Sequence, residues 1–228
     1  MRYVISDIHG EYDLFRLLLE SIKFSEKDTL YICGDILDKG TQPVRLAKAV
    51  SMIKNAKCIL GNHEYEFLKY YHSLLQSSPK NFDEVLRALQ AYFPDDGCLL
   101  DWETVDWIED LPAYIEEDEF ICVHAGIPTG TSHRPLSLEE IPVEQLIYDR
   151  RFKDPDCLPD TPKCVFFGHT QTDCICGEHK ILGYRRDVSV PAKTVGDFVK
   201  IHLDTGAWAS GVLGCFCIDT LKAIYVKK

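Results

Sequence analysis

The pattern of apolar and polar residues in the first sixty positions alternates between short strand-like runs and one-sided helical spacings. Apolar residues three and four positions apart give each helical segment one face to bury. This alternation is typical of a parallel sheet covered by helices, so we expect an α/β fold. The expected strands are 2–6, 29–33 and 57–60, and the expected helices are 11–23 and 43–54.

A long helical stretch interrupts this alternation after the third strand. Between 64 and 110 the apolar residues recur at helical spacing, and we expect a helical insertion there. Strand-like runs then return, most of them separated by turn-prone residues. No internal repeat or long linker divides the chain, so residues 1–228 are expected to form a single domain. The later expected strands are 120–124, 164–167, 199–203, 212–218 and 223–226.

The composition is that of an ordinary globular protein. Hydrophobic residues make up 46% of the 228 residues and charged residues 27%, which excludes intrinsic disorder and coiled coil. The longest apolar stretch, 205–218, is shorter than the roughly 20 residues that a membrane helix needs. The first residues run directly into a strand pattern and show no signal peptide. We therefore expect a cytoplasmic protein without a membrane partner.

The net charge of −11 is concentrated in one segment. Residues 95–119 contain eleven Asp or Glu and no Lys or Arg, and the remainder of the chain is balanced. Such a block repels the phosphates of nucleic acids, so general DNA or RNA binding is not expected. The segment is interpreted as a solvated helical face, with a place at the entrance of a site as the alternative.

The ten cysteines are too few for a disulfide-stapled scaffold. Cys33 and Cys164 stand inside apolar runs, where a free thiol behaves as a small buried hydrophobe, so we expect reduced cysteines. Cys174 and Cys176, with the nearby His179, offer a zinc or redox site as one interpretation. Their spacing also fits one face of a strand, or a loop, and no C-x-x-C pair accompanies them.

Residues able to bind a metal follow each of the first three expected strands and two of the later ones. In an open α/β sheet the carboxyl ends of the strands border one crevice, so clusters far apart in the sequence converge there. Oxygen and imidazole ligands in this mixture suit manganese, iron or zinc, and six of them exceed the needs of one tetrahedral ion. Two divalent ions are therefore expected. The six residues are Asp7, His9, Asp35, Asn62, His124 and His169.

Each of these residues also has a plainer explanation when it is taken alone. Asp7 or Asp35 would cap a following helix, and Asn62 suits a turn after Gly61. A single histidine is more often packed or at the surface than bound to a metal. The metal interpretation therefore depends on five strand ends carrying the same chemistry at the same edge.

The order of these motifs resembles the calcineurin-like metallophosphoesterases, in the phosphoprotein phosphatase branch with its bacterial and phage members. The resemblance implies a four-layer α/β/β/α sandwich, in which helices flank two mixed sheets. The motifs that carry it are Asp7-x-His9, Gly34-Asp35-x-x-Asp38, Gly61-Asn62-His63-Glu64, His124-x-Gly126 and Gly168-His169-Thr170, followed by Leu203-Asp204-Thr205-Gly206.

The resemblance also implies how the ligands are shared between two ions. Asp35 would bridge them. A water shared by two ions has a lowered pKa, so a metal-activated hydroxide would attack phosphorus without a phospho-enzyme. Manganese is the first expectation for both ions, with iron or zinc as alternatives. The first ion would be held by Asp7, His9 and Asp35, and the second by Asp35, Asn62, His124 and His169.

Other residues take catalytic and substrate-binding roles by the same resemblance. His63 resembles the general acid that protonates the leaving oxygen, and Asp38 the carboxylate that orients it. Asp38 would otherwise be a loop cap or a surface acid. Lys39 stands where the family usually has arginine, and lysine cannot make the planar bidentate contact of a guanidinium. The expected substrate-binding residues are Lys39, Asn62 and Arg150, with Arg151 as the neighbouring alternative.

The function expected first is a metal-dependent phosphomonoesterase, specifically a bacterial-type serine/threonine protein phosphatase acting on a phosphorylated protein or a small phosphoester. Residues 95–119 would favour basic phosphopeptides if they line the entrance. The alternative is a dinucleoside tetraphosphate hydrolase or another nucleotide or polynucleotide phosphoesterase. A third interpretation is a catalytically silent metal-bound scaffold, which the intact His63 and Asp38 argue against. The oligomeric state stays open.

Overall fold

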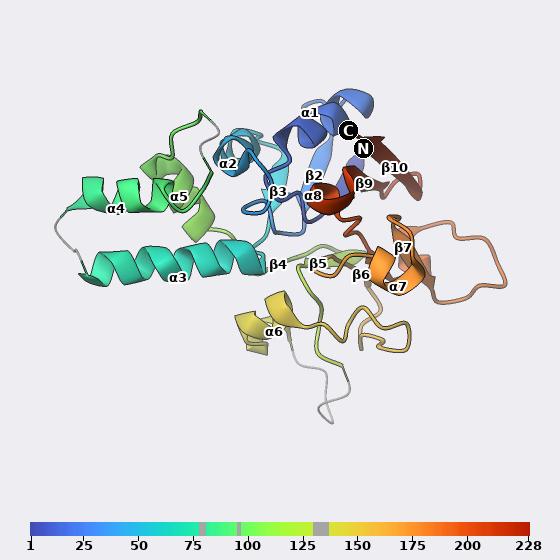
Figure 1. Ribbon diagram of the computed structural model, residues 1–228. Coiled ribbons are helices and arrows are strands. Elements are labelled where there is room, and N and C mark those ends of the chain that lie inside the picture. The colour runs from blue at the N-terminus through green and yellow to red at the C-terminus, as the bar shows by residue number, and fades with distance from the viewer. Residues whose placement is uncertain (78–80, 95–96, 130–136) are drawn as a thin grey trace.

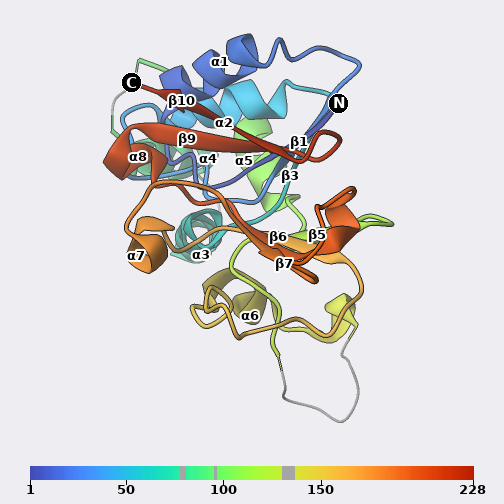
Figure 2. The ribbon, with the colours of Figure 1, turned by 90° about the vertical axis from the view of Figure 1, so that its right-hand side faces the viewer.

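The computed structural model describes residues 1–77, 81–94, 97–129 and 137–228. These residues form two five-stranded sheets, each containing parallel and antiparallel pairs. Figure 2 shows the sheets stacked in the middle of the molecule, with α1 and α2 on one outer side and α6 on the other. The expected sandwich of two mixed sheets flanked by helices is confirmed.

The first sheet contains the three N-terminal strands expected from the sequence, paired in parallel. Two C-terminal strands extend the sheet beyond β1 by antiparallel pairing, giving the order β10-β9-β1-β2-β3. The apolar faces of two helices cover the outer side. The strands are β1 (Arg2–Ile5), β2 (Thr29–Ile32), β3 (Ala56–Cys58), β9 (Val212–Cys217) and β10 (Lys222–Lys227), and the helices are α1 (Tyr12–Ser21) and α2 (Pro43–Ser51).

The second sheet has the order β4-β5-β6-β8-β7, with parallel strands at its centre and an antiparallel strand at each edge. α6 packs Leu146 and Ile147 against its outer face. The elements are β4 (Tyr114–Glu116), β5 (Phe120–Val123), β6 (Cys164–Phe167), β7 (Leu182–Arg185), β8 (Phe198–His202) and α6 (Val143–Tyr148).

The core between the sheets explains why the central strands are apolar on both faces. Successive side chains of a strand point to opposite sides. Ile5 of β1 therefore packs under the helices, whereas Val4 joins the cluster that faces the second sheet. From the other side Phe120 and Phe166 enter this cluster, with ring centroids 5.4 Å apart in an edge-to-face arrangement. This apolar layer packs the two sheets face to face.

The expected helical insertion is present and lies to one side of the sandwich (Figure 1). Its first helix begins directly after the third strand, at Asn62 rather than at 64. Asp101 caps the last helix, because its side chain accepts a hydrogen bond of 2.9 Å from the N–H of Thr104. The helices are α3 (Asn62–Ser77), α4 (Phe82–Gln90) and α5 (Trp102–Glu109).

Several short elements were not expected from the sequence. β4 and β7 are edge strands with mixed exposure, so they lack a continuous apolar run. Single helical turns form at α7 (Asp173–Cys176) and α8 (Ala207–Ser210), each followed by a glycine in the left-handed conformation. α2 ends at Ser51 instead of 54. None of the described helices is both long and apolar enough to cross a membrane.

The cysteines behave as expected, with one correction. None of the ten, all of which lie in the described residues, forms a disulfide bond, and those in the central strands are buried. Cys174 and Cys176 do not share the face of a strand, because they lie exposed on the single turn of α7. Within the described part of the chain, neither they nor His179 belongs to a group of converging metal-ligand atoms.

Much of the acidic segment is paired with bases from elsewhere in the chain. Glu119 meets Arg2 at the amino end of β1, the end of the strand opposite to Asp7, so it does not line the edge that carries the metal-ligand motifs. Residues 95 and 96 lie outside the described residues. Ion pairs or charged hydrogen bonds join Asp101 to Lys48, Glu109 to His72, Glu116 to Lys163, Glu117 to Lys57 and Glu119 to Arg2.

Candidate metal centre

The loops after β1 and β2 run side by side beyond the ends of the strands. The N–H of Asp7 donates to the carbonyl of Gly34 at 3.2 Å, and the N–H of His9 to that of Asp35 at 3.0 Å. These backbone bonds extend the parallel pairing of the strands into the loops. They place the side chains of two separate sequence motifs at one edge of the first sheet.

The second sheet joins the first at this edge. The N–H of His169 donates to Asp7 Oδ2 at 3.0 Å, and the N–H of Gly168 donates to the carbonyl of His124 at 2.7 Å. A Cβ on Gly168 would overlap the carboxylate of Asp7 and the hydroxyl of Ser6. Only glycine therefore allows the two sheets to approach so closely here.

Asp35 lies at the centre of the predicted ligands. Its Oδ2 atom is 3.5 Å from His9 Nε2, 3.4 Å from His124 Nε2 and 3.9 Å from His63 Nε2. Burial opposes the charge of this carboxylate, but the neighbouring histidines, with His124 the largest influence, hold its pKa well below the usual range. An ionised carboxylate between two groups of ligands is suited to bridging two cations.

One group of ligands is formed by Asn62, His124 and His169. Asn62 Oδ1 is 2.9 Å from His124 Nε2 and 2.8 Å from His169 Nδ1, and the two ring nitrogens are 3.2 Å apart. Ligand atoms about 2.0–2.2 Å from one ion lie roughly 3 Å from each other. The spacing of these atoms, with Asp35 Oδ2 beside them, fits a divalent cation.

The other group contains His9, Asp35 and Asp7. Asp7 Oδ1 lies 3.9 Å from His9 Nε2, and its second oxygen accepts a hydrogen bond from the hydroxyl of Ser6. Burial raises the pKa of Asp7 to about 6, and the nearby charge of Asp35 adds to this. The structure thus brings all six predicted ligands to one edge of the sandwich.

Hydrogen bonds fix the rings of two histidines in the orientation that metal binding requires. His9 Nδ1 lies 2.9 Å from the carbonyl of Leu37, and His124 Nδ1 lies 2.8 Å from that of Cys33. A ring that donates its Nδ1 proton to a carbonyl presents the Nε2 lone pair to the site. Burial lowers the pKa of His9 to about 4, which keeps that ring neutral.

The charge of the centre also favours a cation. Burial disfavours the charged ring of His124, but the carboxylates of Asp35 and Asp7 outweigh it and raise its pKa to about 10. Burial and the charge of His124 lower the pKa of His169 to about 3. His169 Nε2 is buried and has no hydrogen-bond partner among the described residues. The donor set therefore fits the metal ions implied by the motifs, with His169 Nδ1 beside Asn62 Oδ1 as the ligand atom of that ring.

Backbone conformation at the edge is unusual. Eight described residues other than glycine have a positive φ, which is sterically costly for residues with a side chain. Six of them belong to the predicted site, and such conformations cluster where function requires them. The six are Asp7, His9, Asp35, Asp38, Lys39 and His169, with φ between 48° and 70°.

The predicted acid pair is formed. His63 Nδ1 lies 2.8 Å from Asp38 Oδ2, so its Nε2 faces the centre. Burial disfavours the charged ring of His63, but the hydrogen bond to Asp38 and the charge of Asp35 outweigh it and raise its pKa. The hydroxyl of Tyr92, from the segment after α4, is 3.5 Å from the same Asp38 oxygen. Asp38 is therefore more than a loop cap.

The predicted phosphate-binding residues lie at the margin of the centre. Lys39 Nζ is 3.0 Å from His9 Nε2, and the same ammonium lies 5.6 Å from the ring centroid of Trp208 on α8. Arg150 is exposed, and its positive charge contributes to the lowered pKa of His169. The choice of Arg150 over Arg151 as a phosphate-binding residue stays a prediction.

Sequence reasoning assigned no role to Glu64, which organises the loop after β2. Its side chain is fully buried and accepts four backbone hydrogen bonds of 2.8–3.0 Å. Burial raises the pKa of Glu64 to about 7, while these N–H donors oppose the rise. Its position one residue after His63 was the only available signal. The donors are the N–H groups of Asp35, Ile36, Leu37 and Gly61.

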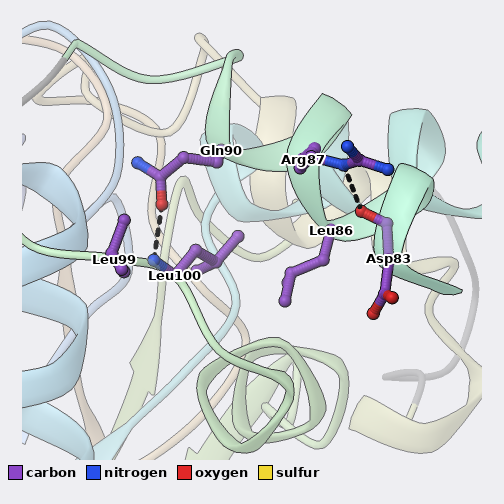
Figure 3. A pocket seen from close by; sticks show the side chains of 6 residues that line it. All are labelled: Asp83, Leu86, Arg87, Gln90, Leu99 and Leu100. Atoms are coloured by element: carbon purple, nitrogen blue, oxygen red, sulfur yellow. Dashed lines mark hydrogen bonds between the residues drawn. The ribbon is translucent and has the colours of Figure 1, made fainter.

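A separate hollow lies on the helical insertion and shares no residue with the metal centre. It has a volume of about 450 Å³. Figure 3 shows its lining side chains on α4 and on the segment that precedes α5. Three leucines and three polar or charged residues line it, and no metal-ligand group that the described residues form includes any of them. The residues are Asp83, Leu86, Arg87, Gln90, Leu99 and Leu100.

We predict that Glu64→Gln destabilises the protein by about 2–4 kcal/mol, because an amide replaces an acceptor of four buried N–H groups and turns a donor toward them. Urea unfolding measures the change. The exposed Glu20→Gln serves as the control and should change stability by less than about 0.5 kcal/mol. Equal stability of the two variants would show that the loop does not depend on Glu64.

Comparison with known proteins agrees with this geometry. A bis(5'-nucleosyl)-tetraphosphatase, symmetrical, from Aggregatibacter actinomycetemcomitans is 32% identical over 129 residues, which are 55% of this chain and 44% of that protein. This chain thus matches less than half the length of that relative.

Solved structures share the fold over nearly the whole chain. A protein provisionally named a diadenosine tetraphosphatase superposes with a TM-score of 0.67 at 18% identity, covering 99% of this chain and 92% of that one. A metallophosphoesterase from Sphaerobacter thermophilus gives 0.59 at 18% identity, covering 100% and 87%. The family model of the calcineurin-like phosphoesterases matches residues 2–200, and this chain belongs to that family.

Proposed function

We propose that this metallophosphoesterase hydrolyses dinucleoside polyphosphates of the tetraphosphate type. The relative from Aggregatibacter actinomycetemcomitans, named a symmetrical tetraphosphatase, supports this substrate over the phosphoprotein that the motifs first suggested. The observation that carries the proposal is the arrangement of two groups of metal-ligand atoms beside exposed aromatic rings. Cleavage in the middle of the chain would consume one water and release two nucleoside diphosphates.

The six ligands would hold two divalent ions, with manganese expected first and iron or zinc as alternatives. When bound, such ions lower the pKa of water and stabilise charge at phosphorus. Asp35 would hold both, because its Oδ2 atom faces His9 on one side and His124 on the other. Lys39, Asn62 and Arg150 would bind the phosphate oxygens and orient the phosphorus for attack.

His63 would supply the proton for the oxygen that leaves. Its Nδ1 is held by Asp38, and its Nε2 is the atom that faces the centre. The bond formed joins the attacking oxygen to phosphorus, and the bond broken joins phosphorus to the bridging oxygen. The leaving oxygen takes a proton from His63 Nε2, and Asp38 stabilises the ring in both protonation states.

Two exposed rings next to the centre could stack on the bases of a dinucleotide. Trp208 is 43% exposed and lies against the ammonium of Lys39. Tyr92 is 39% exposed, stacks on Tyr70 with a centroid distance of 5.5 Å, and reaches Asp38 with its hydroxyl. Each base stacked on an aromatic ring contributes about 1–3 kcal/mol to binding.

One observation favours the serine/threonine phosphatase as the second candidate. The His63–Asp38 pair is complete, and general acid catalysis matters most when the leaving group is a poor one such as a serine alkoxide. A nucleoside diphosphate leaves more readily and needs less help. The same pair argues against a silent scaffold, because a scaffold has no use for a proton donor.

The substrate class is tested by product analysis of the manganese-loaded protein. Diadenosine tetraphosphate and a phosphoserine peptide are supplied in parallel, with a chelator as the control. We expect ADP from the dinucleotide and abolition of this product by the chelator. Release of phosphate from the peptide alone would reject the proposal in favour of the protein phosphatase.

The role of His63 is tested by the dependence on the leaving group. His63→Gln should lower kcat for an alkyl phosphate about 10²–10⁴-fold, because the alkoxide loses its proton donor. The loss should be much smaller for 4-nitrophenyl phosphate, whose leaving group needs no proton. Equal losses for both substrates in stopped assays would show that His63 is not the acid.

Trp208 is tested by comparing nucleotide and simple substrates. Trp208→Ala should raise KM for diadenosine tetraphosphate about tenfold through the lost stacking, and Trp208→Phe should retain most of the binding. KM for 4-nitrophenyl phosphate should stay within about twofold, since that substrate has no base. A parallel rise for both substrates would instead assign Trp208 to the support of Lys39.

A further inference from the structure

A buried lysine lies in the middle of β8, the strand that pairs with β6. The side chain of Lys200 is fully buried, and lysine is almost never found so unless its ammonium is paired. Its partners are three backbone carbonyls: Phe152 O at 2.6 Å, Asp154 O at 2.6 Å and Cys157 O at 2.7 Å. All three N–H donors of the ammonium are therefore used.

Aromatic rings surround the same ammonium. It lies 4.9 Å from the ring centroid of Phe152, 4.8 Å from that of Tyr184 and 5.9 Å from that of Phe167. Cation–π contacts of this kind strengthen when they are shielded from water. Burial lowers the pKa of Lys200 to about 8, so most of the ammonium remains charged at neutral pH. The charge thus stabilises an irregular segment, 152–157, that has no regular secondary structure.

This segment is wedged between the loops that carry His124 and His169. The ring of Phe152 occupies the space in which a Cβ on Gly126 would sit, two residues after His124. On its other side Phe152 packs edge-to-face on Phe167, two residues before His169, with centroids 4.9 Å apart. Phe152 therefore contacts the supports of both histidines.

His202, two residues after Lys200 on β8, supports the same region. His202 points to the same face as Lys200, because side chains two positions apart on a strand share a face. Its ring stacks on Phe167 with a centroid distance of 4.3 Å, and its Nε2 lies 2.6 Å from the carbonyl of Thr170. Burial lowers the pKa of His202 to about 4, so this ring is a neutral donor. Through Lys200 and His202, β8 thus holds both the segment 152–157 and the loop that carries His169.

Arg150 lies two residues before Phe152, next to the segment 152–157 that Lys200 holds. α6 ends two residues before Arg150 and is tied to the His124 loop, because the N–H of Ala125 donates to the carbonyl of Leu146 at 2.8 Å. We propose that Lys200 is a positioning residue that fixes segment 152–157 against the histidine loops and so sets where Arg150 meets the substrate phosphate. The inference rests on the proposed phosphoester hydrolysis, but it does not depend on the nucleotide part of the substrate.

The test uses the manganese-loaded full chain with inorganic phosphate as a competitive inhibitor of 4-nitrophenyl phosphate hydrolysis. Lys200→Met keeps the length of the side chain but removes the three donors. We expect the inhibition constant of phosphate to rise about tenfold, as expected for a weakened charge-assisted contact. Manganese affinity, measured by calorimetry, should stay within about twofold. The exposed Lys180→Met is the matched control and should change neither quantity.

A double-mutant cycle separates positioning from general support of the fold. Arg150→Ala alone should raise the inhibition constant about tenfold, and Lys200→Met should then add less than about twofold, because both act through one contact. Lys200→Gln, which retains two N–H donors, should fall between wild type and Lys200→Met. This milder variant carries the test if the methionine protein does not fold.

Three outcomes would overturn the inference: an unchanged inhibition constant in Lys200→Met or Lys200→Gln, full additivity with Arg150→Ala, or loss of manganese binding in step with phosphate binding. The inhibition constant of phosphate and the manganese affinity can be measured whichever class of substrate the protein hydrolyses. A wild-type protein that hydrolyses 4-nitrophenyl phosphate but leaves diadenosine tetraphosphate intact would reject the proposed nucleotide substrate and leave the test of Lys200 intact.

Discussion

The negative charge of Asp35, buried among three imidazole rings, is the constraint on which the rest of the site depends. A carboxylate out of water is costly unless positive or hydrogen-bonding groups surround it. Several elements supply those groups: His9 lies in the loop after β1, His63 in the first turn of α3, and His124 directly after β5 of the second sheet. The backbone accepts positive φ at the same edge to bring them within reach.

The sequence pattern allowed the α/β class, the central strands and the convergence of the candidate ligands to be predicted for one physical reason, whereas the sandwich of two sheets came from the resemblance of the motifs to a known family. Residues such as Asp7, Asn62 and His169 directly follow apolar runs, and the ends of parallel strands meet at one edge. The local sequence pattern therefore indicates which residues lie at the metal centre. The choice of substrate is different, since it depends on exposed rings such as Trp208 whose neighbours are set by tertiary structure alone.

What could not be predicted belongs to long-range packing. In the sequence, Lys200 interrupts an apolar strand. Only its contact with the segment 152–157 explains why a charged side chain is buried there. Glu64 looks like an ordinary first-turn acid of a helix, although it binds N–H groups from another loop. The edge strand β7 has too few buried positions to show a period. In each case the partner is distant in sequence.

The bond from the N–H of His169 to Asp7 spans the two sheets at the point where the cations would sit. Ligands from both sheets thus converge on one centre. Binding of cations there would therefore also stabilise the packing of one sheet against the other. A conservative substitution far from the centre, such as one at the Phe166–Phe216 contact between the sheets, would then change the metal affinity. In this architecture the stability of the hydrophobic core and the affinity of the metal centre are coupled.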